Sequence, residues 1–133
     1  MHYLALLGTD ETTAPEPGTP DYDGGLGGYI RFGTDNADTI LAGDALERSA
    51  QSVTVRHAGD EPLVTDGPYA ETTEAISGYY MLEAETLDDA IDLARQIPAA
   101  ESGWVALRPA AGWWDYAEDE ATGDRFLAVM YGK

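Results

Sequence analysis

Apolar and polar residues follow one another in short blocks along the chain, and most blocks have the length of a single strand. Some are continuous apolar runs, as in HYLALL near the start, and others alternate strictly, as in SVTVRH at residues 52–57. Both patterns are typical of buried or half-buried strands. The predicted strands are 2–7, 39–46, 52–57, 62–65, 76–84, 103–108 and 125–131. Residues 58–61 (AGDE) predict a hairpin turn, and Gly43 predicts a turn or bulge.

Two segments have helical spacing instead. Thr86 is a good N-cap for a helix in which apolar residues recur at three- and four-residue steps until Pro98. Tyr22–Asp38 predicts a weaker helix, because each of its several glycines costs about 1 kcal/mol relative to alanine. Residues 9–20, rich in Thr, Pro, Glu and Asp, predict a loop. The order of elements matches a split βαβ, ferredoxin-like α+β fold with an antiparallel sheet and helices on one sheet face.

Composition narrows the functional classes. A chain of 133 residues suits one domain, and 25 acidic against 7 basic residues give a net charge of −18, which repels phosphate backbones and anionic lipids. We therefore expect neither nucleic-acid binding nor membrane association. The sequence has no cysteine, so thiol chemistry is excluded. With no apolar run long enough to span a membrane and no secretory leader, we expect a soluble, cytoplasmic protein.

One motif carries a family resemblance. Residues 65–80 read TDGPYAETTEAISGYY, and the Asp66-Gly67-Pro68 step predicts a sharp turn. The motif resembles the signature of YCII-related proteins of the DGPF type, TDGPF-AET-KE followed by a Gly-Tyr-Tyr strand. The resemblance also includes MHYLALLG, LAGDAL, TLDDAIDLARQIPAA and VALRPA. It covers residues 1–110 and leaves 111–133 as an aromatic and acidic extension, whose strand joins the same domain or a dimer partner.

The resemblance implies a dimeric α+β barrel in which a second subunit covers the open sheet face. It also implies a homodimer that binds a small molecule, without a cofactor, and isomerase- or lyase-like acid–base activity. The alternative is a non-catalytic binding or regulatory module, since the family is linked to sigma factors by association. Whether the protein is an enzyme stays open. The chain departs from the family pattern at Tyr69 and Thr73, so a lysine–carboxylate pair is absent.

Three residues are candidates for acid–base chemistry. Asp66 is a candidate acid or base if Pro68 and Tyr69 shield it, and the alternative is an Asx-turn at the corner. His57 is a candidate partner for Asp66 across the predicted hairpin, and the alternative is an exposed imidazole at a strand end. Tyr69 is a candidate hydrogen-bond donor to a substrate oxygen.

Five further residues are candidates for substrate contacts. Glu71 and Glu74 share one face if their segment is helical, and are otherwise a solvated turn; without a third ligand they do not predict a metal site. Alternation places Tyr79 on the face opposite Tyr80, so at most one of them lines a given pocket. Arg108 either binds a substrate carboxylate or pairs with an acidic residue. Asp44 either faces the same pocket or belongs to a turn.

Overall fold

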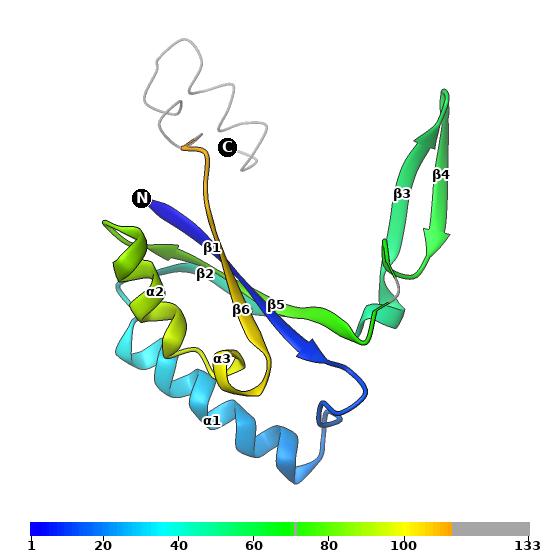
Figure 1. The fold of residues 1–133 in the computed structure, drawn as a ribbon. Helices are drawn as coiled ribbons and strands as arrows, with labels where there is room; N and C mark the ends of the chain where they lie inside the picture. Colours follow the sequence, from blue (N-terminus) through cyan, green and yellow to red (C-terminus); the bar gives the residue numbers. More distant parts are fainter. Residues whose placement is uncertain (71, 113–133) are drawn as a thin grey trace.

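The chain folds around a four-stranded antiparallel sheet (Figure 1). The computed structural model describes residues 1–70 and 72–112, so Glu71, the 111–133 extension beyond residue 112, and its predicted strand 125–131 lie outside the described residues. The sheet has the order β2-β5-β1-β6. Its strands are β1 (His2–Asp10), β2 (Ile40–Ala45), β5 (Glu74–Glu83) and β6 (Trp104–Pro109). This order is that of a ferredoxin-like split βαβ fold, and the predicted α+β class is confirmed.

Three helices lie on one face of this sheet (Figure 1). They are α1 (Pro20–Asp35), α2 (Leu87–Arg95) and the short α3 (Ala99–Ser102). The predicted cap of α2 is confirmed, because the Thr86 side chain accepts a hydrogen bond from the Asp89 amide at 3.1 Å. The weaker helix is also present: Thr19 caps α1 and Pro20 occupies its first turn, where a proline is tolerated. Among the described residues, no helix combines the length and the apolar character needed to cross a membrane.

The core lies between the helices and the covered sheet face. Alternation along β1 directs Tyr3, Ala5 and Leu7 toward the helices, where each is almost fully buried. From α1, Phe32 packs edge-on against the Tyr80 ring of β5, with ring centroids 5.1 Å apart. No polar or charged residue of the described part of the chain is fully buried. The covered face is therefore a conventional apolar core.

The Trp104 side chain lies over Gly8 on the face of the sheet opposite the helices, which we call the open face. Gly8 and Trp104 are direct cross-strand partners in β1 and β6. The indole covers Gly8 so closely that a Cβ built on the glycine would lie 1.8 Å from the Trp104 Cε2 atom. Gly8 is therefore required by the position of the ring, because any side chain there displaces it.

A two-stranded hairpin projects from the body, on the side of the sheet away from the helices (Figure 1). We call it the arm; it consists of β3 (Val53–Ala58) and β4 (Glu61–Asp66), preceded by a 3-10 turn, η1 (Ser49–Gln51). The predicted hairpin turn is confirmed, and Gly59 adopts a positive φ of 67° there. At the base of the arm, Gly67 has a φ of 101° and its amide bonds the Ser52 carbonyl at 2.6 Å. The predicted corner at Asp66-Gly67-Pro68 is therefore present.

One local prediction is wrong, and the condition attached to another is not met. The helix that would place Glu71 and Glu74 on one face does not include Glu74, which begins β5 opposite Asp10. Gly43 is a regular strand residue rather than a turn or bulge, and the register shift of β2 lies between Ile40 and Ala42. Tyr80 explains the glycine: its ring lies over Gly43, where an added Cβ would come within 2.6 Å of it.

Candidate ligand-binding groove

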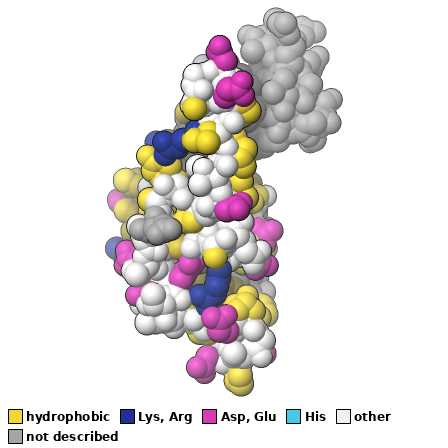
Figure 2. Space-filling model, turned by 90° about the vertical axis from the view of Figure 1, so that its right-hand side faces the viewer, with side chains coloured by type: hydrophobic (Ala, Val, Ile, Leu, Met, Phe, Trp, Pro, Cys, Tyr) yellow, Lys and Arg dark blue, Asp and Glu magenta, His cyan; other side chains and the backbone are white. Residues whose placement is uncertain are grey.

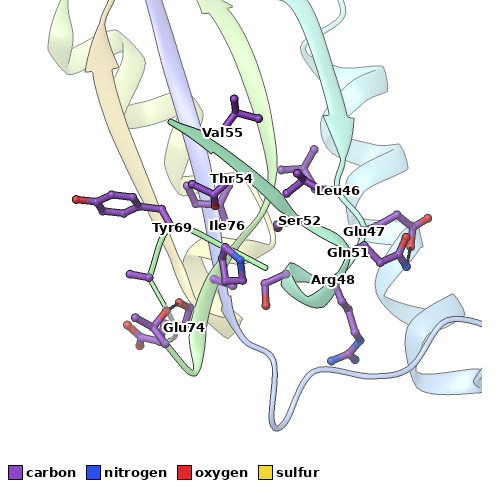
Figure 3. A pocket seen from close by; sticks show the side chains of 16 residues that line it. Leu46, Glu47, Arg48, Gln51, Ser52, Thr54, Val55, Tyr69, Glu74 and Ile76 are labelled. Atoms are coloured by element: carbon purple, nitrogen blue, oxygen red, sulfur yellow. Dashed lines mark hydrogen bonds between the residues drawn. The ribbon is translucent and has the colours of Figure 1, made fainter. Parts of the chain in front are cut away.

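A hollow of about 840 Å³ lies where the arm joins the sheet (Figure 3). We call it the groove. One wall is residues 46–55, from the end of β2 through η1 into β3, and the other is formed by residues between 68 and 76. The second wall belongs to the DGPY motif and the start of β5. The groove therefore has two walls that are adjacent in space because both chain segments connect the arm to the sheet.

The lining of the groove is apolar with polar groups at intervals. Leu46, Val53, Val55, Tyr69 and Ile76 all line it and are between 44% and 78% exposed. Polar side chains stand among them, and these include Gln51, Thr54, Thr72 and Glu74. Such a lining resembles that of small-molecule sites, in which a few polar groups orient a ligand held by apolar contact.

The floor of the groove is fixed by a clamp from the loop after β1. The Glu11 carboxylate accepts hydrogen bonds from the Ser49 amide at 2.8 Å and from the Ser49 hydroxyl at 2.6 Å. These bonds, first of all the one from the hydroxyl, lower the pKa of Glu11 below its usual value. The Arg48 guanidinium donates to the carbonyls of Glu11 at 2.8 Å and Ala14 at 3.1 Å. The clamp joins segments almost 40 residues apart in the chain and holds the η1 wall in place.

Tyr69 and Glu74 are the two predicted site residues that line the groove. Tyr69 is 78% exposed, and the Arg56 guanidinium lies 4.5 Å from its ring centroid, a cation–π contact that orients the ring. Glu74 is exposed at the start of β5. The structure therefore brings together a phenol and a carboxylate from the motif, in an open and solvated setting.

Asp66 and His57 do not form the predicted pair. In the arm, His57 lies opposite Pro62 near the turn, whereas Asp66 lies opposite Val53 at the base. Four residues of strand separate the two, a distance of about 13 Å. Both side chains are exposed. Asp66 remains next to the groove, because Val53 and Pro68 both line it; His57 lies toward the tip of the arm.

Asp44, Tyr79 and Arg108 lie on the open face of the sheet. Tyr79 and Tyr80 point to opposite faces, and Asp44 is the direct partner of Tyr79. Arg108 pairs with Leu4 on the other edge of the sheet. Asp44 and Arg108 stand on opposite edge strands, about 14 Å apart across three strand spacings and offset by two residues along the strands. None of these three is among the residues that line the groove.

The open face also holds a pair that sequence reasoning missed. His2 and Glu83 are cross-strand partners in β1 and β5, and the His2 Nε2 atom lies 2.6 Å from a Glu83 carboxylate oxygen. The N-terminal amine is 3.4 Å from the other oxygen. No signal in the sequence identifies this pair, since it depends on the register between strands more than 60 residues apart. Within residues 1–70 and 72–112, no three His, Asp or Glu side chains are grouped to hold a metal ion.

Comparison with known proteins finds a relative with a similar amino-acid sequence. An uncharacterized protein of Rhizobium meliloti (strain 1021) is 40% identical over 62 residues, and the match spans 45% of this chain and 50% of that protein. The chain thus matches about half the length of this relative.

A solved structure that matches the chain is the 5-chloro-2-hydroxyhydroquinone dehydrochlorinase from Burkholderia phenoliruptrix AC1100, in complex with 2,5-dihydroxybenzoquinone. It matches with a TM-score of 0.46 and 12% identity over 83% of this chain and 93% of its own. The YCII-related domain matches residues 37–114, which include β2, the whole arm, both walls of the groove and β5 through β6. The chain therefore belongs to the YCII-related domain family.

Proposed function

We propose that the protein is a homodimer that binds a small organic molecule in the groove. One observation carries this proposal. Residues of the DGPY motif, by which the chain resembles its family, form part of one wall of the groove. The groove volume of about 840 Å³ lies within the range of small-molecule sites, roughly 300–1,000 Å³.

The groups in the groove favour a neutral ligand. Glu47 and Glu74 supply negative charge at its rim, which disfavours phosphates and carboxylates. Arg48 is the cation nearest the floor, but its guanidinium is already bound by the carbonyls of Glu11 and Ala14 and by the Glu16 carboxylate. A small cyclic molecule with hydroxyl or carbonyl groups fits this setting, because the apolar side chains contact its ring and neutral polar groups bind its oxygens.

Asp66 is the proposed acid–base residue of this site, without a cofactor. Its position beside Val53 and Pro68 places a carboxylate at the rim of the groove, within the same motif as the Tyr69 phenol. A proton transfer on the bound molecule would use Asp66 as the base, while the Tyr69 phenol, which packs against Arg56 on the other face of the arm, would contact the ligand from the second wall of the groove. The reaction class is isomerisation or elimination, in which a proton is removed next to a carbonyl.

Groove binding is tested by filling the groove. A panel of neutral cyclic hydroxy- and oxo-compounds is screened by ligand-observed NMR, and the hits are titrated against Leu46→Trp and Leu41→Trp. Both leucines are 48% exposed, but only Leu46 lines the groove. We expect the hit affinity to fall at least tenfold in Leu46→Trp and to stay within twofold in Leu41→Trp. Equal affinity in the two variants contradicts binding in the groove.

Catalysis is tested separately from binding. Asp66→Asn should reduce turnover of a groove ligand by roughly 10²–10⁴-fold with little change in affinity, as expected for loss of a general base. Asp60→Asn, at the tip of the same arm, is the control and should retain activity. Unchanged turnover in Asp66→Asn would assign the chemistry to another residue.

A non-catalytic binding module is the second candidate function. The arm exposes Val53, Val55, Leu63 and Val64, all more than half accessible, which is unusual for a surface that contacts only water. Figure 2 views the molecule from the arm side and shows hydrophobic side chains gathered between charged ones. If groove ligands bind without any turnover in the wild-type chain, the module is the better description.

The homodimer itself is supported by the open face. Three helices cover one face of the sheet, while β1 and β5 present Leu4, Leu6 and Met81 on the other. An antiparallel sheet with apolar side chains on both faces needs a cover on each. Sedimentation equilibrium should give a mass of twice the 14.2 kDa chain at micromolar concentration. A monomer under those conditions rejects this part of the proposal.

A further inference from the structure

The arm has one face that nothing in the described chain covers. Register and alternation place Val53, Val55 and Val64 together on this face, with Val64 directly opposite Val55, Asp66 opposite Val53 at the base, and His57 toward the tip. The three valines are 57%, 63% and 62% exposed. We call this surface the valine face. The other face of the arm carries Thr54, Thr65 and Arg56 with Leu63 opposite Arg56, and Tyr69 packs there against Arg56.

A free two-stranded hairpin with such a face is not a self-sufficient element. The strands β3 and β4 pair only with each other. Isolated hairpins are at best marginally stable in water, and both strands are edges with unpaired backbone groups. The structure nevertheless shows a regular ladder from Val53–Asp66 to Ala58–Glu61. The arm therefore needs a surface to pack against.

The area available for an interface supports a second copy of the chain as that surface. A sheet of four strands with six to ten residues each presents roughly 19 × 26 Å, or about 500 Å² in projection. A stable interface of standard size needs about 800 Å² from each partner. One face of the arm presents about 200 Å², and the partner surface that it covers adds as much. For each subunit, the open face, one face of its own arm and the surface that the partner's arm covers together reach the required area. The open face alone does not.

Charge favours a second copy of this chain as the occupant. On the open face, Asp44 stands on edge strand β2 and Arg108 on edge strand β6. A two-fold axis parallel to the strands between two facing sheets brings each β2 edge opposite the other copy's β6 edge, so that Asp44 and Arg108 lie on facing edges, offset by two residues or about 7 Å along the strand. In a chain of net charge −18, this self-complementary pair opposes the general repulsion between copies.

We infer that the arm clasps the partner subunit of a homodimer, with the valine face against the second copy. The inference rests on the proposed homodimer and extends it. Val53 and Val55 belong both to the valine face and to the lining of the groove. The partner subunit therefore closes the open side of the groove, and the ligand site is complete only in the dimer.

Matched variants on the two faces of the arm test the clasp. Val64→Asp and Thr65→Asp change neighbouring exposed residues of β4 that point to opposite faces. Sedimentation equilibrium should show the dimer dissociation constant rising at least tenfold in Val64→Asp and less than twofold in Thr65→Asp. Wild-type affinity in Val64→Asp overturns the clasp but leaves the homodimer standing. A monomeric wild-type chain overturns both.

A second measurement does not depend on how well a charged variant folds. Because the chain has no cysteine, Val64→Cys and Thr65→Cys each introduce a single thiol for alkylation by iodoacetamide. In the dimer, the thiol of Val64→Cys should react at least tenfold more slowly than that of Thr65→Cys. Dilution below the dissociation constant should abolish the difference. Equal rates in the dimer would mean that the valine face stays free, which overturns the inference.

Discussion

Removal of the Glu11 carboxylate tests the clamp that holds the groove floor. In Glu11→Ala, the Ser49 amide and hydroxyl lose the acceptor they share at 2.8 and 2.6 Å. A hydrogen bond to a charged group contributes about 1.5–3 kcal/mol to the free energy of unfolding, and the lower end applies because Glu11 is only half-buried. Two such bonds predict a loss of roughly 3 kcal/mol, which for a chain of this size lowers the melting temperature by about 9–12 °C.

Glu16→Ala is the matched control for this prediction. Glu16 contacts the same clamp through one ion pair with Arg48 at 3.4 Å, and its side chain is 71% exposed. Exposed pairs of this kind contribute about 0–1 kcal/mol. Urea unfolding followed by tyrosine and tryptophan fluorescence measures both variants at pH 7. An equal loss of stability in the two variants would refute the clamp.

The dependence on pH gives an independent check. The pKa of Glu11 is lowered in the folded chain, first by the Ser49 hydroxyl and then by the Ser49 amide. A carboxyl group with a lowered folded-state pKa stabilises the fold above its unfolded pKa, about 4.3, and that contribution is lost as the pH falls through the folded value. The stability gap between wild type and Glu11→Ala should therefore narrow from pH 7 to pH 3. A gap that stays constant over this range contradicts the argument.

Gly8→Ala should destabilise the chain by about 2–3 kcal/mol, because the added Cβ would lie 1.8 Å from the Trp104 ring. Gly33→Ala is the matched variant in α1, where an added Cβ has no neighbour within 4 Å, and it should stabilise the chain by about 0.5–1 kcal/mol. Thermal melts compare the two, and shifts of the same sign would show that the indole yields freely. Burial raises the pKa of Tyr80 and of Tyr29. Phenols with raised folded-state pKa values stabilise the fold below their unfolded pKa, about 10, and this contribution is lost as pH rises through the folded values. Tyr80→Phe should therefore lose less stability than wild type between pH 9 and pH 11 in urea titrations, and parallel losses would contradict the assignment.

The sequence predicted the elements of the fold wherever a local pattern determined them. The Thr86 cap, the alternation of β3 and the turn at Gly59 each depend on neighbouring residues only, and each is confirmed. A shared face for Glu71 and Glu74 depends on a helical segment, and Glu74 lies in strand β5 instead. Pairing of Glu74 with Asp10 of β1 overrides the local spacing of the two glutamates.

The candidate site was harder to predict, because its geometry depends on register and on distant contacts. The His57–Asp66 prediction failed since a tight turn at residues 59–60 pairs His57 with Pro62, which leaves Asp66 at the far end of the ladder. The contacts between Glu11 and Ser49 and between His2 and Glu83 join residues 38 and 81 positions apart in the chain, respectively. No spacing within a single segment carries information about such contacts.

Helix α1 is long but intrinsically weak, and this affects how the protein opens. Its 16 residues include glycines at 24, 25, 27, 28 and 33, each of which costs about 1 kcal/mol of helix propensity. Phe32 is its one fully buried side chain among the described residues. In amide hydrogen exchange, α1 should therefore open as a sub-global unit before β1 and β5. The open state would uncover the Tyr80 side of the sheet while the groove and the arm, on other elements, stay folded.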